Sequence, residues 1–255
     1  MKRVLTAVVL VPLVLYVVLW SPQWAVLAVT ALVALLCYHE FSGIAAGYGA
    51  SRLGPVGYAA GLVILALPGS TALLAVAVTL IAMTLALRAD DLRAGILRAA
   101  FLLMGVVYVF GCWRFAPMLG AENRYWLLYA LAVNWVGDIG AYYIGRSLGR
   151  HKLAPVVSPG KSWEGAAASL ASSLIFGFLF LHWSIPAVPP EMVLGLTVAA
   201  NVAGQFGDLC ESALKRGAGV KDSGTLLPGH GGMLDRVDST LFTLPVVYLY
   251  VAGRW

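Results

Sequence analysis

The sequence predicts an all-α, polytopic integral membrane protein, and three observations carry this prediction. Only 11% of the 255 residues are charged, whereas soluble domains have about 25%. Hydrophobic residues make up 60% of the chain, and the mean hydropathy is +0.85. Long uncharged segments recur along the sequence. A soluble globule of this composition would expose a large apolar surface, and a disordered chain or a coiled coil would carry more charge.

About nine membrane-crossing helices are expected, because roughly 20 apolar residues span the hydrocarbon core. The first, residues 4–20, resembles a signal peptide, but no small-residue cleavage site follows it, so we retain it as a helix. Residues 53–87 are too long for one crossing, and Pro68-Gly69-Ser70 divides them into two helices. The other expected helices are residues 23–38, 96–113, 125–145, 165–183, 192–207 and 239–252.

The charges of the loops orient these helices. With the N-terminus inside, fourteen of the 17 Lys and Arg residues fall on the inner side, and only Arg114, Arg124 and Arg254 fall outside. This bias predicts an N-in, C-out topology in the inner (cytoplasmic) membrane of the cell. We expect one membrane domain, with about five helices in residues 1–120. Residues 121–255 then hold the remaining helices and two long loops that face the cytoplasm.

Asp138 lies inside an expected helix, eight residues and about 12 Å before Arg146. A carboxylate at that depth costs at least about 2.5 kcal/mol unless it faces a partner, a metal ion or a wet cavity. It therefore makes either a polar contact between helices or part of a functional site. The neighbouring Gly137, Gly140 and Gly145 leave room for close packing or a ligand, which favours the second interpretation.

The first inner loop, residues 146–164, combines glycines with Arg146 and Lys161. Such a loop next to a helix start can bind an anion, and it can equally contact anionic lipid head groups. Gly160-Lys161-Ser162 resembles the end of a P-loop. The first glycine of that motif would fall at Pro155, and no parallel strand is expected before it, so we reject the match.

The second inner loop, residues 208–238, is dense in Gly, Asp, Lys and Arg. Asp208, Ser212 and Lys215 recur at three- and four-residue steps and would share one face of a helix. Aspartates supply oxygen ligands for Mg²⁺, and basic side chains neutralise phosphate oxygens. The composition therefore favours a site where a hard cation meets several phosphates over a mere solvated connector.

Other chemistries find little support. The three cysteines and His230 have no neighbours at the spacing of zinc ligands, so we interpret His230 as a hydrogen-bonding loop residue that could donate to a phosphate. No G-x-S-x-G segment is present, which argues against a serine hydrolase.

The loop motifs as a set resemble a known pattern. The matching positions are Ser212, Leu214, Lys215, Arg216, Lys221, Asp222, Gly224, Leu227, Pro228, His230, Gly231, Gly232, Met233, Asp235, Arg236, Val237 and Asp238. This 27-residue segment resembles the signature of phosphatidate cytidylyltransferases, also called CDP-diacylglycerol synthases. Upstream, residues 138–146 and 158–165 are similar to two further family segments. Gly160 stands where the family usually has Lys. The resemblance covers roughly the second half of the chain.

The resemblance implies a reaction of phospholipid biosynthesis, in which CMP passes from CTP to phosphatidic acid and pyrophosphate is released. It also implies dependence on Mg²⁺ and in-line attack of the lipid phosphate on the CTP α-phosphorus. Positioning and charge neutralisation would supply most of the catalysis. CTP, phosphatidic acid and membrane lipids are the expected partners, nucleic acid is not, and a second copy of the chain is a candidate partner.

Within this interpretation we expect Asp208 and Asp235 to hold Mg²⁺ and to act with Lys215 and Arg216 at the catalytic centre. Asp138 is a further candidate ligand, and a second cation is a candidate too. The residues expected to bind substrates are Arg146, Lys161, Ser212, Lys221, Asp222, His230, Gly231, Gly232, Arg236 and Asp238.

The sequence disfavours three rival functions. An ion-coupled transporter would place its charges near the midplane of the membrane, whereas these gather at one face. A polyprenol kinase or an archaeal-lipid cytidylyltransferase is disfavoured by the complete 27-residue match. A CDP-alcohol phosphotransferase would need a D-G-x-x-A-R motif, which the chain lacks.

Overall fold

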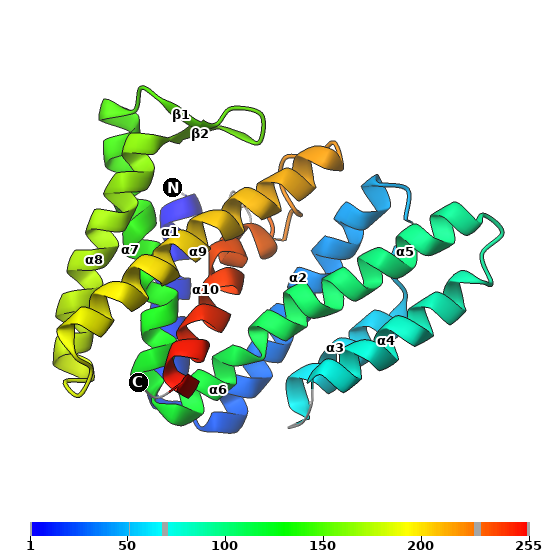
Figure 1. The fold of residues 1–255 in the computed structure, drawn as a ribbon, viewed down its shortest axis with the longest axis horizontal. Helices are drawn as coiled ribbons and strands as arrows, with labels where there is room; N and C mark the ends of the chain where they lie inside the picture. Colours follow the sequence, from blue (N-terminus) through cyan, green and yellow to red (C-terminus); the bar gives the residue numbers. More distant parts are fainter. Residues whose placement is uncertain (1, 51, 68–70, 227–230, 254–255) are drawn as a thin grey trace. The chain divides into compact units, whose positions relative to one another are not determined.

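The computed structural model describes residues 2–50, 52–67, 71–226 and 231–253 (Figure 1). The first five helices are α1 (Lys2–Trp20), α2 (Gln23–Gly47), α3 (Pro55–Ala66), α4 (Thr71–Ala86) and α5 (Leu92–Gly105). A π-helical segment, η1 (Val106–Gly111), follows α5. The remaining elements are α6 (Phe115–Glu122), α7 (Arg124–Leu148), β1 (Lys152–Ala154), β2 (Ser158–Ser162), α8 (Trp163–Ser184), α9 (Pro190–Gly217) and α10 (Leu234–Gly253).

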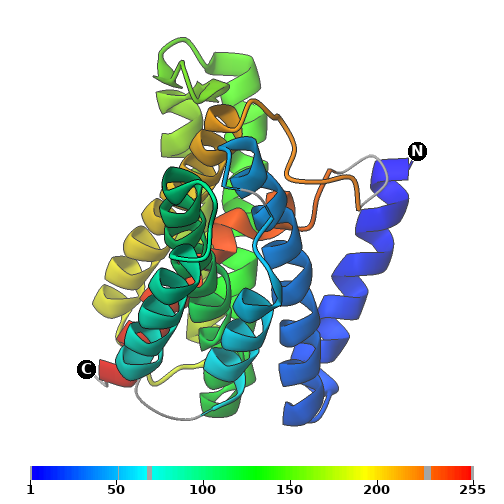
Figure 2. The same ribbon diagram turned by 90° about the vertical axis from the view of Figure 1, so that its right-hand side faces the viewer.

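The chain forms two compact units. The first comprises Met1–Leu10, Pro22–Pro117 and Leu214–Arg236, and the second comprises Val11–Ser21, Met118–Ala213 and Val237–Trp255. In the first unit α4 packs along α5, and in the second α7 packs along α8 over most of their length (Figures 1 and 2). The ends of α9 and α10 that carry the second inner loop belong to the first unit.

The mainly helical architecture of a membrane protein is confirmed. In the part of the chain that the structure describes, five helical segments are long and apolar enough to cross a membrane. They are Gln23–Gly47, Leu92–Glu122, Arg124–Leu148, Trp163–Ser184 and Pro190–Gly217. Helices α3 and α4 are apolar but shorter. The count of nine crossings and the N-in orientation stay predictions.

Most predicted breaks between helices are observed. Helix α1 ends at Trp20 and α2 begins at Gln23, on either side of Ser21-Pro22. Helix α3 ends at Ala66 and α4 begins at Thr71, while the predicted break at residues 68–70 lies outside the described residues.

Two helix ends were predicted too early. Helix α2 continues nine residues past the predicted end at residue 38, and α9 continues ten residues past residue 207. In both cases the apolar stretch ends where charged residues begin, but the backbone continues as a helix, and Glu40, Asp208 and Lys215 find partners in other segments of the chain. The predicted shared face of Asp208 and Ser212 is confirmed, since the Ser212 hydroxyl donates to the Asp208 carboxylate at 3.3 Å.

The short β1–β2 hairpin was not predicted. It lies inside the first inner loop, pairs Lys152 with Ser162 and Ala154 with Ser158, and leads directly into α8. Ser162 caps that helix, because its hydroxyl accepts from the Gly165 amide at 3.2 Å. Since Lys161 lies within an antiparallel strand, the rejection of a P-loop agrees with the structure.

Helices α7 and α8 approach closely through small residues, as their glycines suggested. A Cβ atom added at Gly137 would lie 2.6 Å from the Ser169 hydroxyl of α8 and 2.9 Å from the Asn201 amide of α9. Near the C-terminal end of α7, a Cβ at Gly145 would lie 3.4 Å from the Cα of Gly165. Small residues let membrane helices pack backbone to backbone. This packing places the C-terminal end of α7 beside the hairpin and the start of α8.

Candidate functional site

A cavity of about 430 Å³ opens in the second unit, among α7, the hairpin, α8, α9 and the start of α10. Its polar lining includes Asp138, Arg146, Lys161, Gln205, Asp208 and Ser239. Four of these side chains belong to the predicted site, and they come from three segments up to 70 residues apart. The close packing of α7 and α8 is what brings these segments together.

Lys161 and Asp208 form an ion pair across this cavity, with 2.6 Å between Nζ and Oδ2. Their side chains are 28% and 31% exposed, so both remain accessible to a bound molecule. The pair joins the two inner loops that the sequence analysis treated separately. A partly exposed pair contributes at most about 1 kcal/mol to stability, which leaves these groups available for binding.

A network of buried amides and hydroxyls lies beneath the ion pair. The Asn201 Nδ2 donates to the hydroxyls of Ser169 at 3.0 Å and Ser173 at 2.9 Å. The Gln205 Nε2 donates to the Asn201 Oδ1 at 2.7 Å. Sequence reasoning missed these residues, although Asn201 and Gln205 at four-residue spacing in an apolar helix were a usable signal.

Carboxylates crowd the same region. Burial, followed by the charges of the nearby Asp208 and Glu211, raises the pKa of Asp238 well above its ordinary value. The charge of Asp138 acts in the same direction. Such crowding favours a bound cation, and carboxylate oxygens are the ligands that Mg²⁺ prefers. Among the described residues no group of three or more His, Cys, Asp or Glu side chains is arranged to hold a metal ion. The donor chemistry therefore fits Mg²⁺, with substrate oxygens needed to complete its coordination.

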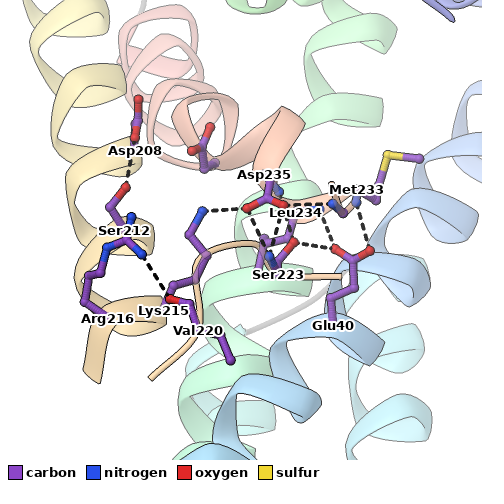
Figure 3. Close-up of polar contacts among 12 residues, drawn as sticks. Glu40, Asp208, Ser212, Lys215, Arg216, Val220, Ser223, Met233, Leu234 and Asp235 are labelled. Carbon is purple, nitrogen blue, oxygen red and sulfur yellow. Dashed lines mark hydrogen bonds and ion pairs between the residues drawn. The ribbon is translucent and has the colours of Figure 1, made fainter. Parts of the chain in front are cut away.

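Asp235 belongs to the first unit and is enclosed by donors (Figure 3). Its carboxylate accepts from Lys215 Nζ at 2.5 Å, from the Ser223 amide at 3.0 Å and from the Gly232 amide at 2.8 Å. The side chains of Lys215 and Asp235 are only 10% and 6% exposed. Burial alone would raise the pKa of Asp235, but the hydrogen bonds from Lys215 and Gly232 hold it below its ordinary value. Asp235 is therefore anionic, and metal binding would require Lys215 to shift.

Glu40 in α2 is the acidic residue that the sequence analysis missed. Its side chain is 7% exposed and accepts from the Ser223 hydroxyl at 2.8 Å and from the amides of Met233 at 2.9 Å and Leu234 at 2.8 Å (Figure 3). Because the helix was expected to end at residue 38, Glu40 fell just past its predicted end and was not considered as a site residue. The rule that an ionisable residue in an apolar helix marks a functional site, applied to Asp138, would have found it.

The structure also places the remaining predicted residues. Arg146 donates to the Tyr142 hydroxyl at 2.8 Å beside the cavity. Arg216 donates to the Val220 carbonyl oxygen at 3.3 Å. Lys221, Asp222 and Arg236 are exposed in the first unit. His230 lies outside the described residues, and joint metal binding by Asp208 and Asp235 stays a prediction.

The hairpin is fixed to α8 by Glu164. Its carboxylate lies 2.6 Å from the Nδ1 of His151 and accepts from the amide of Arg150 at 3.2 Å. Hydrogen bonds from its own amide and then from His151 lower the pKa of Glu164 to about 2. This partly exposed carboxylate therefore stays ionised and fixes the residues that lead into β1, which pairs with the strand that carries Lys161.

These features define a helical membrane protein whose polar site gathers carboxylates and cations at helix ends. The family model described as the cytidylyltransferase family matches residues 1–253, and the chain belongs to this family. The predicted family resemblance is thus confirmed.

Several curated proteins named phosphatidate cytidylyltransferase are similar to the chain. One from Staphylococcus aureus (strain COL) is 45% identical over 148 residues, which are 58% of this chain and 57% of that protein. One from Staphylococcus haemolyticus is 44% identical over 148 residues, with the same shares of 58% and 57%. One from Bacillus subtilis is 41% identical over 155 residues, 60% of this chain and 58% of the relative. The chain thus spans less than three fifths of the length of these relatives.

Proposed function

We propose that the protein is a phosphatidate cytidylyltransferase, which transfers CMP from CTP to phosphatidic acid and releases pyrophosphate. The family membership and the names of the relatives support this proposal. The observation that carries it is the cavity in which Lys161 and Asp208 meet beside Asp138 and Arg146. A cavity with both cations and carboxylates suits a substrate that brings phosphates together with a divalent ion.

The chemistry requires little beyond charge and position. The phosphate of phosphatidic acid is already an anion at neutral pH, so its attack on the CTP α-phosphorus needs no strong general base. Lys161 and Arg146 at the cavity, and Lys215 and Arg216 at the end of α9, would neutralise the phosphates of the two substrates. Basic groups on helices and on the hairpin would hold the reacting atoms in line, which is the larger part of such catalysis.

Asp208 and Asp235 are the residues that we propose to hold Mg²⁺, with Asp138 and Asp238 as further candidates. The ion would supply charge neutralisation at the phosphates. Each of the first two carboxylates faces a lysine ammonium within its own unit, so each lies where positive charge is stabilised. We further propose that the site faces the cytoplasm, where CTP is present, and that phosphatidic acid enters from the inner leaflet.

Incorporation of labelled CTP tests this function. Purified protein in mixed micelles of phosphatidic acid, with Mg²⁺ and CTP labelled in the base, should form a labelled lipid and release pyrophosphate in equal amount. Asp208→Asn should lower turnover at least about 100-fold with the protein still folded. Diacylglycerol and polyprenol in place of phosphatidic acid should give no labelled lipid. Absence of label from the lipid with every phospholipid mixture would reject the proposal.

A further inference from the structure

Glu40 holds the loop that connects α9 to α10, which we call the signature loop (residues 218–233). Its two carboxylate oxygens accept from Ser223 near the start of this loop and from Met233 and Leu234 at its end. All of these residues belong to the first unit. One side chain in α2 thus fixes both limbs of a loop that lies more than 180 residues further along the chain.

A carboxylate suits this position physically. The first amides of a helix have no acceptor within the helix, and its N-terminus carries a partial positive charge. Leu234 begins α10, so Glu40 supplies from α2 an acceptor for the first amide of that helix. Hydrogen bonds from the amides of Met233 and Leu234 and from the Ser223 hydroxyl compensate for the loss of water around the Glu40 carboxylate, since Glu40 is only 7% exposed.

Two glycines of the signature loop make room for this carboxylate. A Cβ atom added at Gly224 would lie 2.7 Å from the Oε1 and 2.9 Å from the Cδ of Glu40. One added at Gly232 would collide with the Glu40 Oε2 and with the Ser223 hydroxyl. Glycine is therefore required at both positions of the sequence pattern because Glu40, which lies outside that pattern, occupies the space beside them.

Ser223 links Glu40 to the catalytic residues proposed above. Its hydroxyl donates to Glu40 and accepts from the Asp235 amide at 3.3 Å, while its own amide donates to the Asp235 carboxylate. Asp235 in turn binds Lys215. The contacts form a continuous chain from α2 to the ammonium group of Lys215 (Figure 3).

We propose that Glu40 is a positioning residue of the active site, whose carboxylate fixes the signature loop so that Asp235 and Lys215 are held in reactive geometry. This inference rests on the proposed function. It gives a residue of the N-terminal half a role in positioning catalytic groups, whereas the sequence motifs described above all lie in the C-terminal half.

Glu40→Gln is the central test, because it keeps the size of the side chain and removes one acceptor. In either orientation of the new amide, at least one backbone donor faces an NH₂ group. We expect kcat for CTP incorporation to fall roughly 10- to 100-fold, and to change more than KM, while the thermal midpoint shifts by only a few degrees. Glu191→Gln, at an exposed position in α9, is the matched control and should leave kcat unchanged.

A double-mutant cycle tests the contact itself. Gly224→Ala should push the Glu40 carboxylate aside and reproduce the loss in kcat. The three atoms nearest to its added Cβ belong to Glu40. In a Glu40→Ala background the same change should therefore add no further loss. Gly43→Ala, an exposed glycine of α2 with no atom within 4 Å of its added Cβ, is the control. If Glu40→Ala does not fold, the kcat values of Gly224→Ala and Gly43→Ala are compared instead. A loss of kcat in Gly224→Ala alone supports the contact, and equal kcat values contradict it.

Hydrogen exchange separates this inference from the proposed function. The amides of Met233 and Leu234 should exchange faster in Glu40→Gln than in the wild type, whatever reaction the protein catalyses. If the wild type incorporates no CTP, the proposed function fails and the exchange still decides whether Glu40 holds the loop. Unchanged exchange, a fall in stability with kcat of the folded protein intact, or additive losses in the cycle would overturn the inference.

Discussion

Two lysine–aspartate pairs in this protein differ in how far their side chains are exposed to solvent. Lys161 and Asp208 are about one third exposed, whereas Lys215 and Asp235 are at most one tenth exposed. All four residues were predicted as site residues from the composition of the two loops together with the family resemblance. Their pairing was not predictable, because it depends on which helix ends the fold brings together.

Removing the lysine from each pair should therefore have unequal effects on stability. Lys161→Met should cost less than about 1 kcal/mol, since water screens the remaining Asp208 charge. Lys215→Met should cost about 3 to 5 kcal/mol, since it leaves a buried carboxylate without its cation. Unfolding midpoints in one detergent compare the two variants, and equal losses would contradict the exposures described here.

Glu164 gives the hairpin a dependence on pH. Its pKa in the folded protein, about 2, lies below the ordinary value of 4.5, so the ionised form favours the folded hairpin. This stabilisation is complete above pH 4.5 and is lost as the pH falls toward 2. Pepsin, which works across this range, should cut wild-type residues 150–162 increasingly fast as the pH falls. Glu164→Gln should be cut fast throughout, and Glu191→Gln should follow the wild type. A flat wild-type rate, relative to a peptide standard, would contradict this role.

At the level of elements, hydrophobicity located the helices but not all of their ends. An apolar window stops at the first charge, whereas α2 and α9 continue as helices well beyond it. The hairpin and η1 could not be predicted either. The hairpin depends on hydrogen bonds between Glu164 and two residues that lie thirteen and fourteen positions earlier, His151 and Arg150. The helix around η1 packs closely against an aromatic ring. A Cβ at Gly105, next to η1, would lie 2.6 Å from the ring of Phe41.

The contact of α7 with α8 can be tested with one methyl group. Gly137→Ala places a Cβ within 3 Å of the Ser169, Ser173 and Asn201 side chains and should destabilise the protein by about 1 to 3 kcal/mol. Gly195→Ala in α9 has open space around the added Cβ and should be neutral or slightly stabilising. Thermal unfolding of both variants measures the difference. Equal midpoints would mean that α7 and α8 are further apart than described.

For the whole molecule, composition was sufficient to predict a helical membrane protein, and the family assignment followed from one loop. The two compact units were not foreseen, because the chain passes from one to the other within α1, α6, α9 and α10. A division of this kind depends on contacts between distant segments. Neither the local composition nor the length of a loop predicts such a division.

The predicted orientation can be checked by labelling single cysteines. After replacement of Cys37, Cys112 and Cys210, an impermeant maleimide should label Ala121→Cys in intact cells and should not label Val220→Cys. Both positions are exposed in the structure. Labelling of Val220→Cys should appear once the cells are opened. The reverse pattern would invert the topology inferred from the distribution of Lys and Arg.

The contact between α2 and the signature loop also imposes a sequence of events during translation. The ribosome adds Glu40 long before it reaches Met233 and Leu234. The carboxylate that accepts these two hydrogen bonds is therefore synthesised before the amides that donate them. A product cut short before residue 233 would retain a carboxylate without these amides. A product that starts beyond α2 would carry the signature loop without the carboxylate that Ser223, Met233 and Leu234 contact.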